Sequence, residues 1–290
     1  MHLLYVTFGN NNRNHTQAYF SIYSFWAKKL TLSSINIITD KPRFYKSIEN
    51  KVNIIEADEA QLLDWKGEYG FFWRIKIKAI EKICSLYAGE PVMYLDSDTF
   101  FWGAADIITQ LSGADNAVMW ENEGTQNSLR SKTMRRMTAD LKNLTIGGLS
   151  ELAGYDMWNA GVVFTPNKKN NKDIEFALTL CDEMCRHKVK DQYVEQFALS
   201  VALQVSYGLQ AASGWMAHYW SNKEEWNDLI REFFLESKME GLSFEEELLK
   251  FSEIDFRKHP VVRLVKNRKR RLLNLIEKSI KDRKVEYLTP

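Results

Sequence analysis

The chain has 290 residues, of which 45% are apolar and 27% charged, with only 5 Pro and 14 Gly. That length and composition suit one large domain with additions, and they exclude disordered and collagen-like chains. The net charge of +1 hides an asymmetry, since residues 257–284 carry 12 Lys or Arg against Glu277 and Asp282, about +10, which leaves about −9 on the rest. The sequence therefore suggests an acidic body with a basic C-terminal arm.

The cysteines and the N-terminus indicate the compartment. The three cysteines lack partners at zinc-ligand spacing, so they read as reduced thiols of a cytosolic protein. Residues 2–8 read as a first strand rather than a signal peptide, and no stretch reaches the ~18 apolar residues that span a bilayer. We expect a cytoplasmic protein that can also lie on the inner face of the cytoplasmic membrane.

The first third of the chain alternates short apolar runs with helical patterns. Strands are predicted at 2–8, 35–39, 52–55 and 91–95, and helices over 15–30 and 70–87. This order is typical of an α/β fold with a mostly parallel sheet covered by helices. Ligands of such sheets bind at the carboxyl ends of the strands.

The later part of the chain predicts two more strands and a helical tail. Apolar runs at 116–121 and 157–165 predict the strands, and the stretch 122–152 between them reads as an irregular binding loop or lid. Helices follow at 171–187, at 191–205 and from 222 to about 284, with a break at His259–Pro260. We expect a catalytic domain over 1–222 and a basic helical extension over 223–290.

Two carboxylates at the end of a strand are the sharpest chemical signal. Asp96 and Asp98 follow the apolar run 91–95, and their alternation puts both on one side of an extended segment. Two like charges so close repel each other, so a buried pair is tolerated mainly when a cation compensates. Oxygen ligands favour Mn²⁺ or Mg²⁺, bound together with phosphate oxygens of a substrate. Because Asp-x-Asp also occurs by chance in solvated loops, the pair needs the support of other segments.

Four segments supply that support, in this order: VMYLDSDTF (92–100), MWNAGVVFTP (157–166), VEQFALS (194–200) and HYWSNKEEW (218–226). They resemble the Asp-x-Asp strand, the Asn-Ala-Gly strand, the acidic-Gln element and the late His–Lys element of nucleotide-diphospho-sugar glycosyltransferases with the GT-A fold. The last segment lacks the Gly and Pro of family-8 glycosyltransferases, and its His-to-Lys spacing is one residue shorter. The chain therefore resembles a GT-A relative of the family-8 glycosyltransferases rather than a member of that family.

The resemblance implies a Rossmann-like GT-A domain with a mixed, mostly parallel sheet and a hexosyltransferase-type activity. A sugar would pass from a nucleotide-diphosphate donor, with UDP expected, to a glycan or lipid-linked acceptor in surface polysaccharide biosynthesis. The implied cofactor, Mn²⁺ or Mg²⁺, would have the ligands Asp96, Asp98 and His218. The donor and its nucleotide would contact Thr7, Phe8, Gly9, Asp40, Lys76, Ser97, Asn159, Gly161 and Lys223. Residues near the reacting carbon would be Glu195, Gln196 and Asp156.

Elementary chemistry agrees with several of these roles. Lys223 would neutralise the leaving diphosphate together with the metal. Lys76 begins the apolar helical stripe that continues through Ile80, Ile83 and Tyr87, so it can reach the cleft from a buried face. An amide donates to and accepts from sugar hydroxyls, and Gly allows close approach of the backbone.

Each of these residues also has a purely structural reading. His218 can be an ordinary, partly buried histidine, Gly161 can mark a bulge, and Glu195 can be an acid favoured by a helix N-terminus. If the reaction inverts configuration, the base could be Asp156, Glu195 or Glu121, whereas the features shared with family 8 favour retention.

Other functions remain open at this stage. One is a non-catalytic GT-A-like protein that binds a sugar nucleotide or a carbohydrate, although the complete set of metal and diphosphate residues favours the enzyme. Another is a basic protein that binds an anionic membrane surface through residues 257–284. Nucleic acid is not expected as a partner, because no recognised module accompanies the charge. A sugar-nucleotide pyrophosphorylase is disfavoured, because the loop after the first strand has the single glycine Gly9.

Overall fold

A seven-stranded sheet forms the centre of the computed structural model, which describes residues 1–125, 132–189 and 193–263. Its strand order is β10-β6-β9-β4-β1-β2-β3. All neighbouring strands are parallel except β9, which is antiparallel to β4 and β6. The strands are β1 (His2–Thr7), β2 (Ser34–Thr39), β3 (Asn53–Glu56), β4 (Val92–Leu95), β6 (Ala117–Met119), β9 (Val162–Thr165) and β10 (Leu209–Ala211). The predicted mixed, mostly parallel α/β sheet is confirmed.

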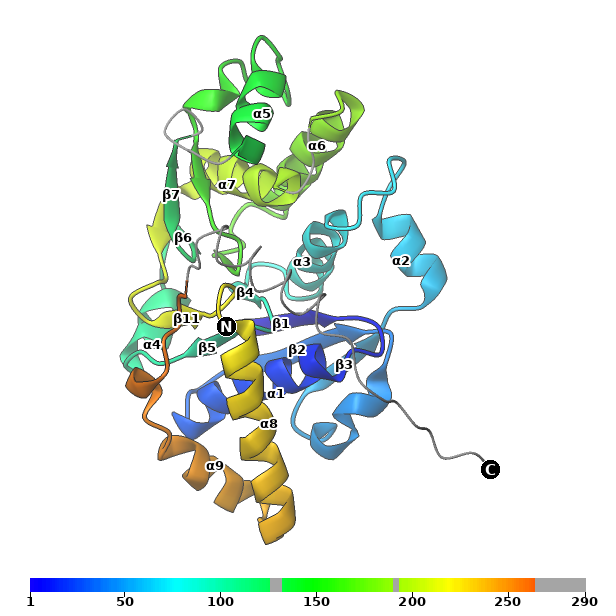
Figure 1. Ribbon diagram of the computed structural model, residues 1–290. Helices are drawn as coiled ribbons and strands as arrows, with labels where there is room; N and C mark the ends of the chain where they lie inside the picture. The colour runs from blue at the N-terminus through cyan, green and yellow to red at the C-terminus, as the bar shows by residue number, and fades with distance from the viewer. Residues whose placement is uncertain (126–131, 190–192, 264–290) are drawn as a thin grey trace, which may run out of the picture.

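Helices cover both faces of this sheet (Figure 1). One face packs against α3 (Arg74–Leu86), α6 (Lys172–Arg186) and α7 (Val194–Tyr207), and the other against α1 (Asn12–Ala27), the 3₁₀ segment η1 (Pro42–Ile48) and α4 (Asp106–Ser112). Strand β1 shows why helices cover both faces of the sheet. Its Leu4 packs in the core on the side of α3, whereas Leu3 and Tyr5 pack in the core on the side of α1. Successive side chains of a strand point to opposite faces, so a strand buried on both sides is apolar throughout.

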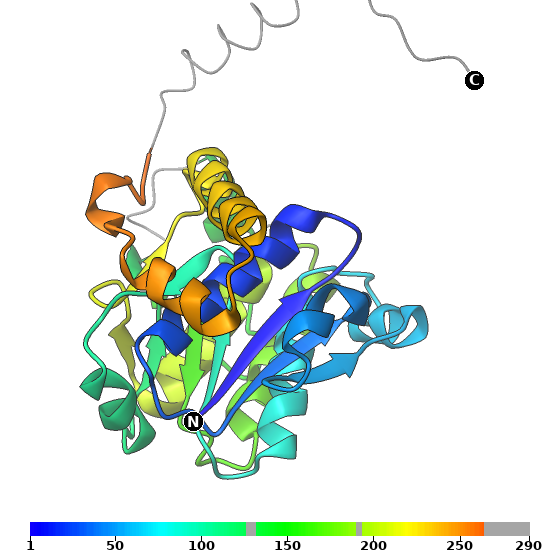
Figure 2. The ribbon, with the colours of Figure 1, turned by 90° about the horizontal axis from the view of Figure 1, so that it is seen from below.

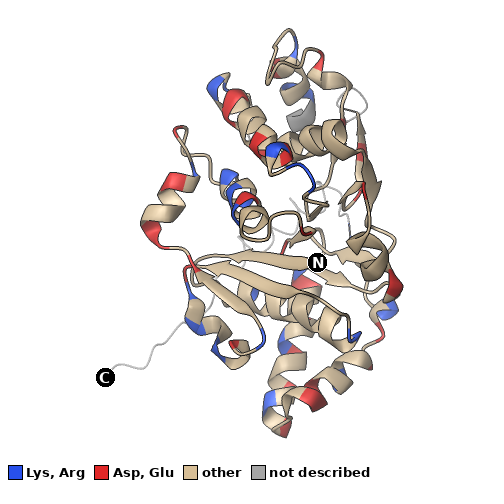
Figure 3. Cartoon of the chain, turned by 180° about the vertical axis from the view of Figure 1, so that it is seen from behind, with Lys and Arg blue, Asp and Glu red and all other residues tan. Residues whose placement is uncertain are grey.

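The C-terminal helices form a third layer outside α1 (Figure 2). They are α8 (Lys223–Glu240) and α9 (Phe244–Ser252), followed by the 3₁₀ segment η3 (Phe256–Lys258). An aromatic core joins the layers: Phe20 and Tyr23 of α1 contact Phe233 and Phe251. Charged residues belong mainly to the helices and loops, and the central strands are almost free of them (Figure 3).

Two smaller sheets complete the fold. In one, β5 (Thr99–Phe101) pairs with β11 (Met216–His218), and in the other β7 (Asn122–Thr125) pairs with β8 (Asp156–Trp158). The remaining elements are α2 (Glu59–Trp65), α5 (Lys132–Leu141) and the 3₁₀ segment η2 (Leu152–Gly154).

Two predictions from the middle of the chain were wrong. The run 157–165 is not one strand: it divides at Asn159, whose Oδ1 accepts a hydrogen bond from the Gly161 N–H at 3.0 Å and turns the chain between β8 and β9. The stretch 122–152 is not irregular, since it holds β7, α5 and η2. Helix α5 is short and mostly polar, and its buried edge is formed by Met137 and Leu141, four residues apart.

The predicted helical tail is confirmed in part: it is divided into α8, α9 and η3 by breaks at 241–243 and 253–255 that were not predicted, and residues 259–263 form no helix. Residues 264–284, the greater part of the basic arm, lie outside the described residues, so the predicted helix there is untested. In the part of the chain that is described, none of the helices combines the length and the apolar character needed to cross a membrane.

Candidate functional site

The topology of the sheet brings three distant segments to the carboxyl end of β4. Asp96 and Asp98 follow that strand directly. Because β9 runs antiparallel to β4, the residues before β9 lie beside them, and the Asp96 N–H donates to the Gly161 carbonyl at 2.9 Å. In the small sheet, His218 pairs with Thr99, so the end of β11 also lies at Asp98.

Asp96, Asp98 and His218 form one cluster, in which the three possible ligand atoms lie within 4.8 Å of one another. Asp98 is 4% exposed and His218 5%, whereas Asp96 is half-buried. Asp98 Oδ2 lies 2.8 Å from Lys223 Nζ and 3.5 Å from His218 Nε2. Burial by itself would raise the pKa of Asp98, but the charges of His218 and Lys223 hold that pKa well below its usual range.

These three side chains fit a divalent cation. Two carboxylates and one imidazole suit Mn²⁺, and the carboxylates alone suit Mg²⁺. Among the described residues, none donates a well-directed hydrogen bond to the buried Asp98 Oδ2, although the Lys223 ammonium and the His218 ring contact that atom. A buried, charged carboxylate oxygen that accepts no hydrogen bond is the kind of group that a bound metal ion stabilises.

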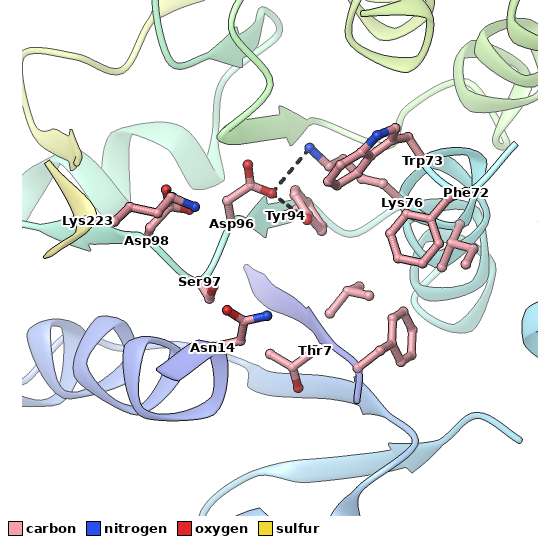
Figure 4. Close-up of a pocket in the computed structure, with 13 residues that line it drawn as sticks. Thr7, Asn14, Phe72, Trp73, Lys76, Tyr94, Asp96, Ser97, Asp98 and Lys223 are labelled. Carbon is pink, nitrogen blue, oxygen red and sulfur yellow. Dashed lines mark hydrogen bonds and ion pairs between the residues drawn. The ribbon is translucent and has the colours of Figure 1, made fainter. Parts of the chain in front are cut away.

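Lys76 lies at the centre of a second, buried group of charges, as its place on the helical stripe predicted. It is 8% exposed, and its Nζ lies 3.2 Å from Asp96 Oδ1 and 3.0 Å from Glu195 Oε1. Burial would lower the pKa of Lys76, but the two carboxylates outweigh this effect and raise the pKa, so the ammonium stays charged. The Tyr94 hydroxyl donates to Asp96 Oδ1 at 2.6 Å, and the lysine lies over its ring (Figure 4).

A cavity opens in front of this group (Figure 4). Its polar lining includes Lys76, Asp96, Ser97, Asp98 and Lys223, and the other lining residues include Thr7, Phe8, Asn14, Phe72 and Trp73. The aromatic side chains of Phe72 and Trp73 are both 48% exposed. The cavity thus offers charge at one end and aromatic rings at the other, which suits a ligand with a phosphate group and a planar ring.

Four of the expected donor residues line no part of this cavity, namely Gly9, Asp40, Asn159 and Gly161. The Gly9 N–H donates to Asp40 Oδ1 at 2.9 Å, and Asp40 Oδ2 pairs with Lys41 at 2.9 Å. Asp40 faces a different cavity, on the side of β3 and α2. Gly9 has a φ of +78°, which favours glycine, so the pair shapes the turn after β1.

The expected catalytic residues are dispersed. Glu195 lies with Lys76 in the buried group, and burial raises its pKa despite the ammonium. Gln196 Nε2 donates to Glu123 Oε2 at 3.3 Å. Asp156 accepts from Asn122 Nδ2 at 2.9 Å in the β7–β8 ribbon.

Sequence reasoning missed Tyr94, Glu123 and the pair Phe72 and Trp73. Tyr94 could have been found, because a side chain two residues before Asp96 points to the same face of the strand. Glu123 gave no signal, because it lies in the segment that was interpreted as a loop.

The loop after β1 depends on a buried histidine, which makes the stability of the protein sensitive to acid. His15 Nε2–H donates to the Gly9 carbonyl at 2.9 Å, and Nδ1 lies 3.1 Å from the Tyr45 hydroxyl. Burial lowers the pKa of His15, although the Gly9 carbonyl opposes this. The stabilisation is therefore complete above the unfolded pKa of about 6.5 and is lost as the pH falls towards the lower folded value.

We expect Tm to fall between pH 7 and pH 5.5, and His15→Gln to flatten that fall. His187→Gln, at an exposed position, is the control and should keep the slope of the wild-type protein. Equal slopes in wild type and His15→Gln would contradict the prediction.

Comparisons with known proteins find similar solved structures but no matching sequence. No family model matches the chain, and no curated protein sequence matches it. Among solved structures it is similar to the galactosyltransferase LgtC in complex with donor and acceptor sugar analogues, with 15% identity, 73% of each chain covered and a TM-score of 0.46. It is also similar to mouse xyloside xylosyltransferase 1, with 10% identity, 72% of this chain and 84% of the other covered and a TM-score of 0.45.

Proposed function

We propose that the chain is a metal-dependent glycosyltransferase that takes its sugar from a nucleotide-diphosphate donor. One observation carries the proposal: the four sequence segments that resemble glycosyltransferase elements meet at one edge of the sheet. Their contributions are Asp96 and Asp98, then Asn159 and Gly161, then Glu195, and finally His218 and Lys223. Chance likenesses scattered over more than a hundred residues would have no reason to converge in space.

Each charged group of the site has a part in such a reaction. When bound, the divalent cation would supply Lewis-acid stabilisation of the charge that develops on the leaving diphosphate. Lys223 is 48% exposed at the start of α8, so its ammonium can contact that diphosphate at the mouth of the cavity. Lys76 is buried and holds Asp96 and Glu195 in place from behind.

The aromatic side of the cavity fits the rest of the donor. Phe72 and Trp73 offer exposed ring surface close to Thr7 and Phe8. Such surface can stack on a nucleobase while the phosphates lie against the charged wall. We propose UDP as the nucleotide and a hexose as the sugar.

A donor screen tests the proposal. The protein is mixed with each of a set of nucleotide sugars, with and without Mn²⁺, and Tm and sugar-nucleotide hydrolysis are measured. One UDP-sugar should raise Tm, because a ligand at 100 times its Kd stabilises the folded state by about 2.7 kcal/mol. EDTA should abolish both the shift and the hydrolysis. A Tm that no nucleotide sugar changes, whether Mn²⁺ is present or not, would reject the proposal.

The acceptor is a further part of the proposal. A glycan or lipid-linked acceptor at the inner face of the cytoplasmic membrane fits the charge of residues 257–284, through which the chain would contact anionic lipid. Co-sedimentation with anionic vesicles should fall when the chain ends at residue 256. Equal sedimentation of the two chains would remove the membrane part and leave the donor part untouched.

A further inference from the structure

His218 is confined by two neighbours, so its ring has little freedom. It makes a T-shaped contact with Trp120, with the ring centroids 5.1 Å apart and the planes at 90°. On another side lies Gly161, where an added Cβ would stand 2.3 Å from His218 Cε1 and Nδ1. Such a distance is far inside van der Waals contact, so only glycine leaves room for the ring. What remains to be set is which ring nitrogen carries the proton.

Two hydrogen bonds assign the orientation of the neighbouring Asn159 amide. Its Oδ1 lies 3.0 Å from the Gly161 N–H, which can only donate. Its Nδ2 lies 3.1 Å from Glu123 Oε1, which accepts as a carboxylate. Each bond independently places the oxygen of the amide towards Gly161 and the nitrogen towards Glu123.

The amide then sets the tautomer of the histidine. His218 Nδ1 lies 3.1 Å from the same Asn159 Oδ1. Because that oxygen can only accept, Nδ1 must carry a proton, and in the neutral ring Nε2 keeps its lone pair. Nε2 is the nitrogen that faces Asp98, at 3.5 Å from Oδ2.

The amide is held in turn by an acid. Glu123 accepts from Asn159 through Oε1 and from Gln196 Nε2, at 3.3 Å, through Oε2. Hydrogen bonds therefore link four side chains in a line that ends in the cluster of Asp96, Asp98 and His218: Gln196, Glu123, Asn159 and His218. Burial raises the pKa of Glu123, and the two amide donors oppose this.

We infer that Asn159 and Glu123 are positioning residues for a metal ligand: Asn159 selects the Nδ1–H tautomer of His218, and Glu123 holds Asn159 in the orientation that does so. The inference rests on the proposed metal site. Residues that support a metal ligand through hydrogen bonds, without contacting the ion, typically contribute about 10–100-fold to metal affinity.

Mn²⁺ titration of the full chain, followed by the electron paramagnetic resonance of free Mn²⁺, tests the inference. Asn159→Ala should weaken Mn²⁺ binding by about 10–100-fold. Without the amide oxygen, the His218 Nδ1–H has no acceptor, and the tautomer that leaves Nε2 free for the metal is no longer favoured. Asn167→Ala is the matched control, since Asn167 is a buried asparagine beyond the other end of β9 from Gly161, where its amide donates to the Cys84 and Tyr87 carbonyls. It should lower Tm and leave Mn²⁺ affinity unchanged.

A reciprocal exchange separates positioning from bulk stability. Asn159→Asp keeps an oxygen for His218 but sets two carboxylates against each other, and should weaken Mn²⁺ binding. Adding Glu123→Gln restores a donor–acceptor pair between positions 123 and 159, so the double variant should recover most of the affinity. This exchange also decides the matter if Asn159→Ala does not fold.

Three outcomes separate the metal site, the positioning role of Asn159 and the role of Glu123. If the wild-type chain binds no Mn²⁺, the metal site and with it the proposed function fail. If the wild type binds and Asn159→Ala binds within about twofold of it, or if Asn167→Ala loses as much affinity, the positioning role is wrong while the site stands. A double variant no better than Asn159→Asp alone would overturn the part assigned to Glu123.

Discussion

Asp98→Asn should abolish metal binding and sugar transfer while leaving the fold intact. The substitution keeps the shape of the side chain but removes the charge from a carboxylate that is 4% exposed and faces His218 and Lys223. Loss of a direct ligand should exceed the loss caused by a supporting residue, so Mn²⁺ affinity should fall by more than about 100-fold. Transfer should fall below detection, because the developing charge on the diphosphate loses the ion that stabilises it.

The fold should survive because the cationic partner of Asp98 has an alternative: Lys223 is half exposed and can turn to solvent. Asp115→Asn is the control: this aspartate pairs with Lys168 at 2.6 Å on the surface, with 88% of its side chain exposed. It should change neither Mn²⁺ binding nor the initial rate of transfer. Unchanged Mn²⁺ affinity in Asp98→Asn would remove the carboxylate from the metal site.

Lys76→Met should have the largest effect on stability. The methionine fills a similar volume but leaves Asp96 and Glu195 without the cation that both contact. Breaking a buried ion pair by removing one partner typically costs about 3–5 kcal/mol, because an uncompensated charge stays buried. The urea concentration at the midpoint of unfolding should therefore fall markedly, while the slope of the unfolding free energy against urea concentration, the m-value, stays unchanged.

Lys78→Met provides the comparison two residues further along the same helix. Lys78 pairs with Glu81, and both side chains are partly exposed, so its loss should cost no more than about 1 kcal/mol. Lys76→Met combined with Glu195→Leu should recover part of the loss, because an apolar replacement of a buried pair is often tolerated. If the two single variants unfold at the same urea concentration, Lys76 does not hold a buried charge cluster.

The local part of the site could be predicted from the sequence because its determinants are local. An apolar run ending in two alternating acids predicts a strand that delivers both carboxylates at its carboxyl end, and β4 does so. The helical stripe that begins at Lys76 predicts a lysine on a buried face, and Lys76 is buried. Both inferences need only the periods of helix and strand, which neighbouring residues set.

The network around His218 could not be predicted in this way. The resemblance predicted sugar contacts for Asn159 and Gly161 but gave no sign that both also lie against an imidazole from a segment more than fifty residues later. Glu123 lies on a strand whose pattern is too short and polar to be recognised. Asp40 reads as a donor residue, but its carboxylate holds the Gly9 turn.

The amino-acid sequence by itself determined the alternating elements, the strand that carries the two acids and the buried lysine behind them, because hydrophobic period and turn chemistry act between neighbours. Only the tertiary structure decided that β9 runs against β4, that β11 brings a histidine to the second acid and that an amide sets the proton on that histidine. Those choices depend on which distant surfaces bury each other, and no local pattern records that.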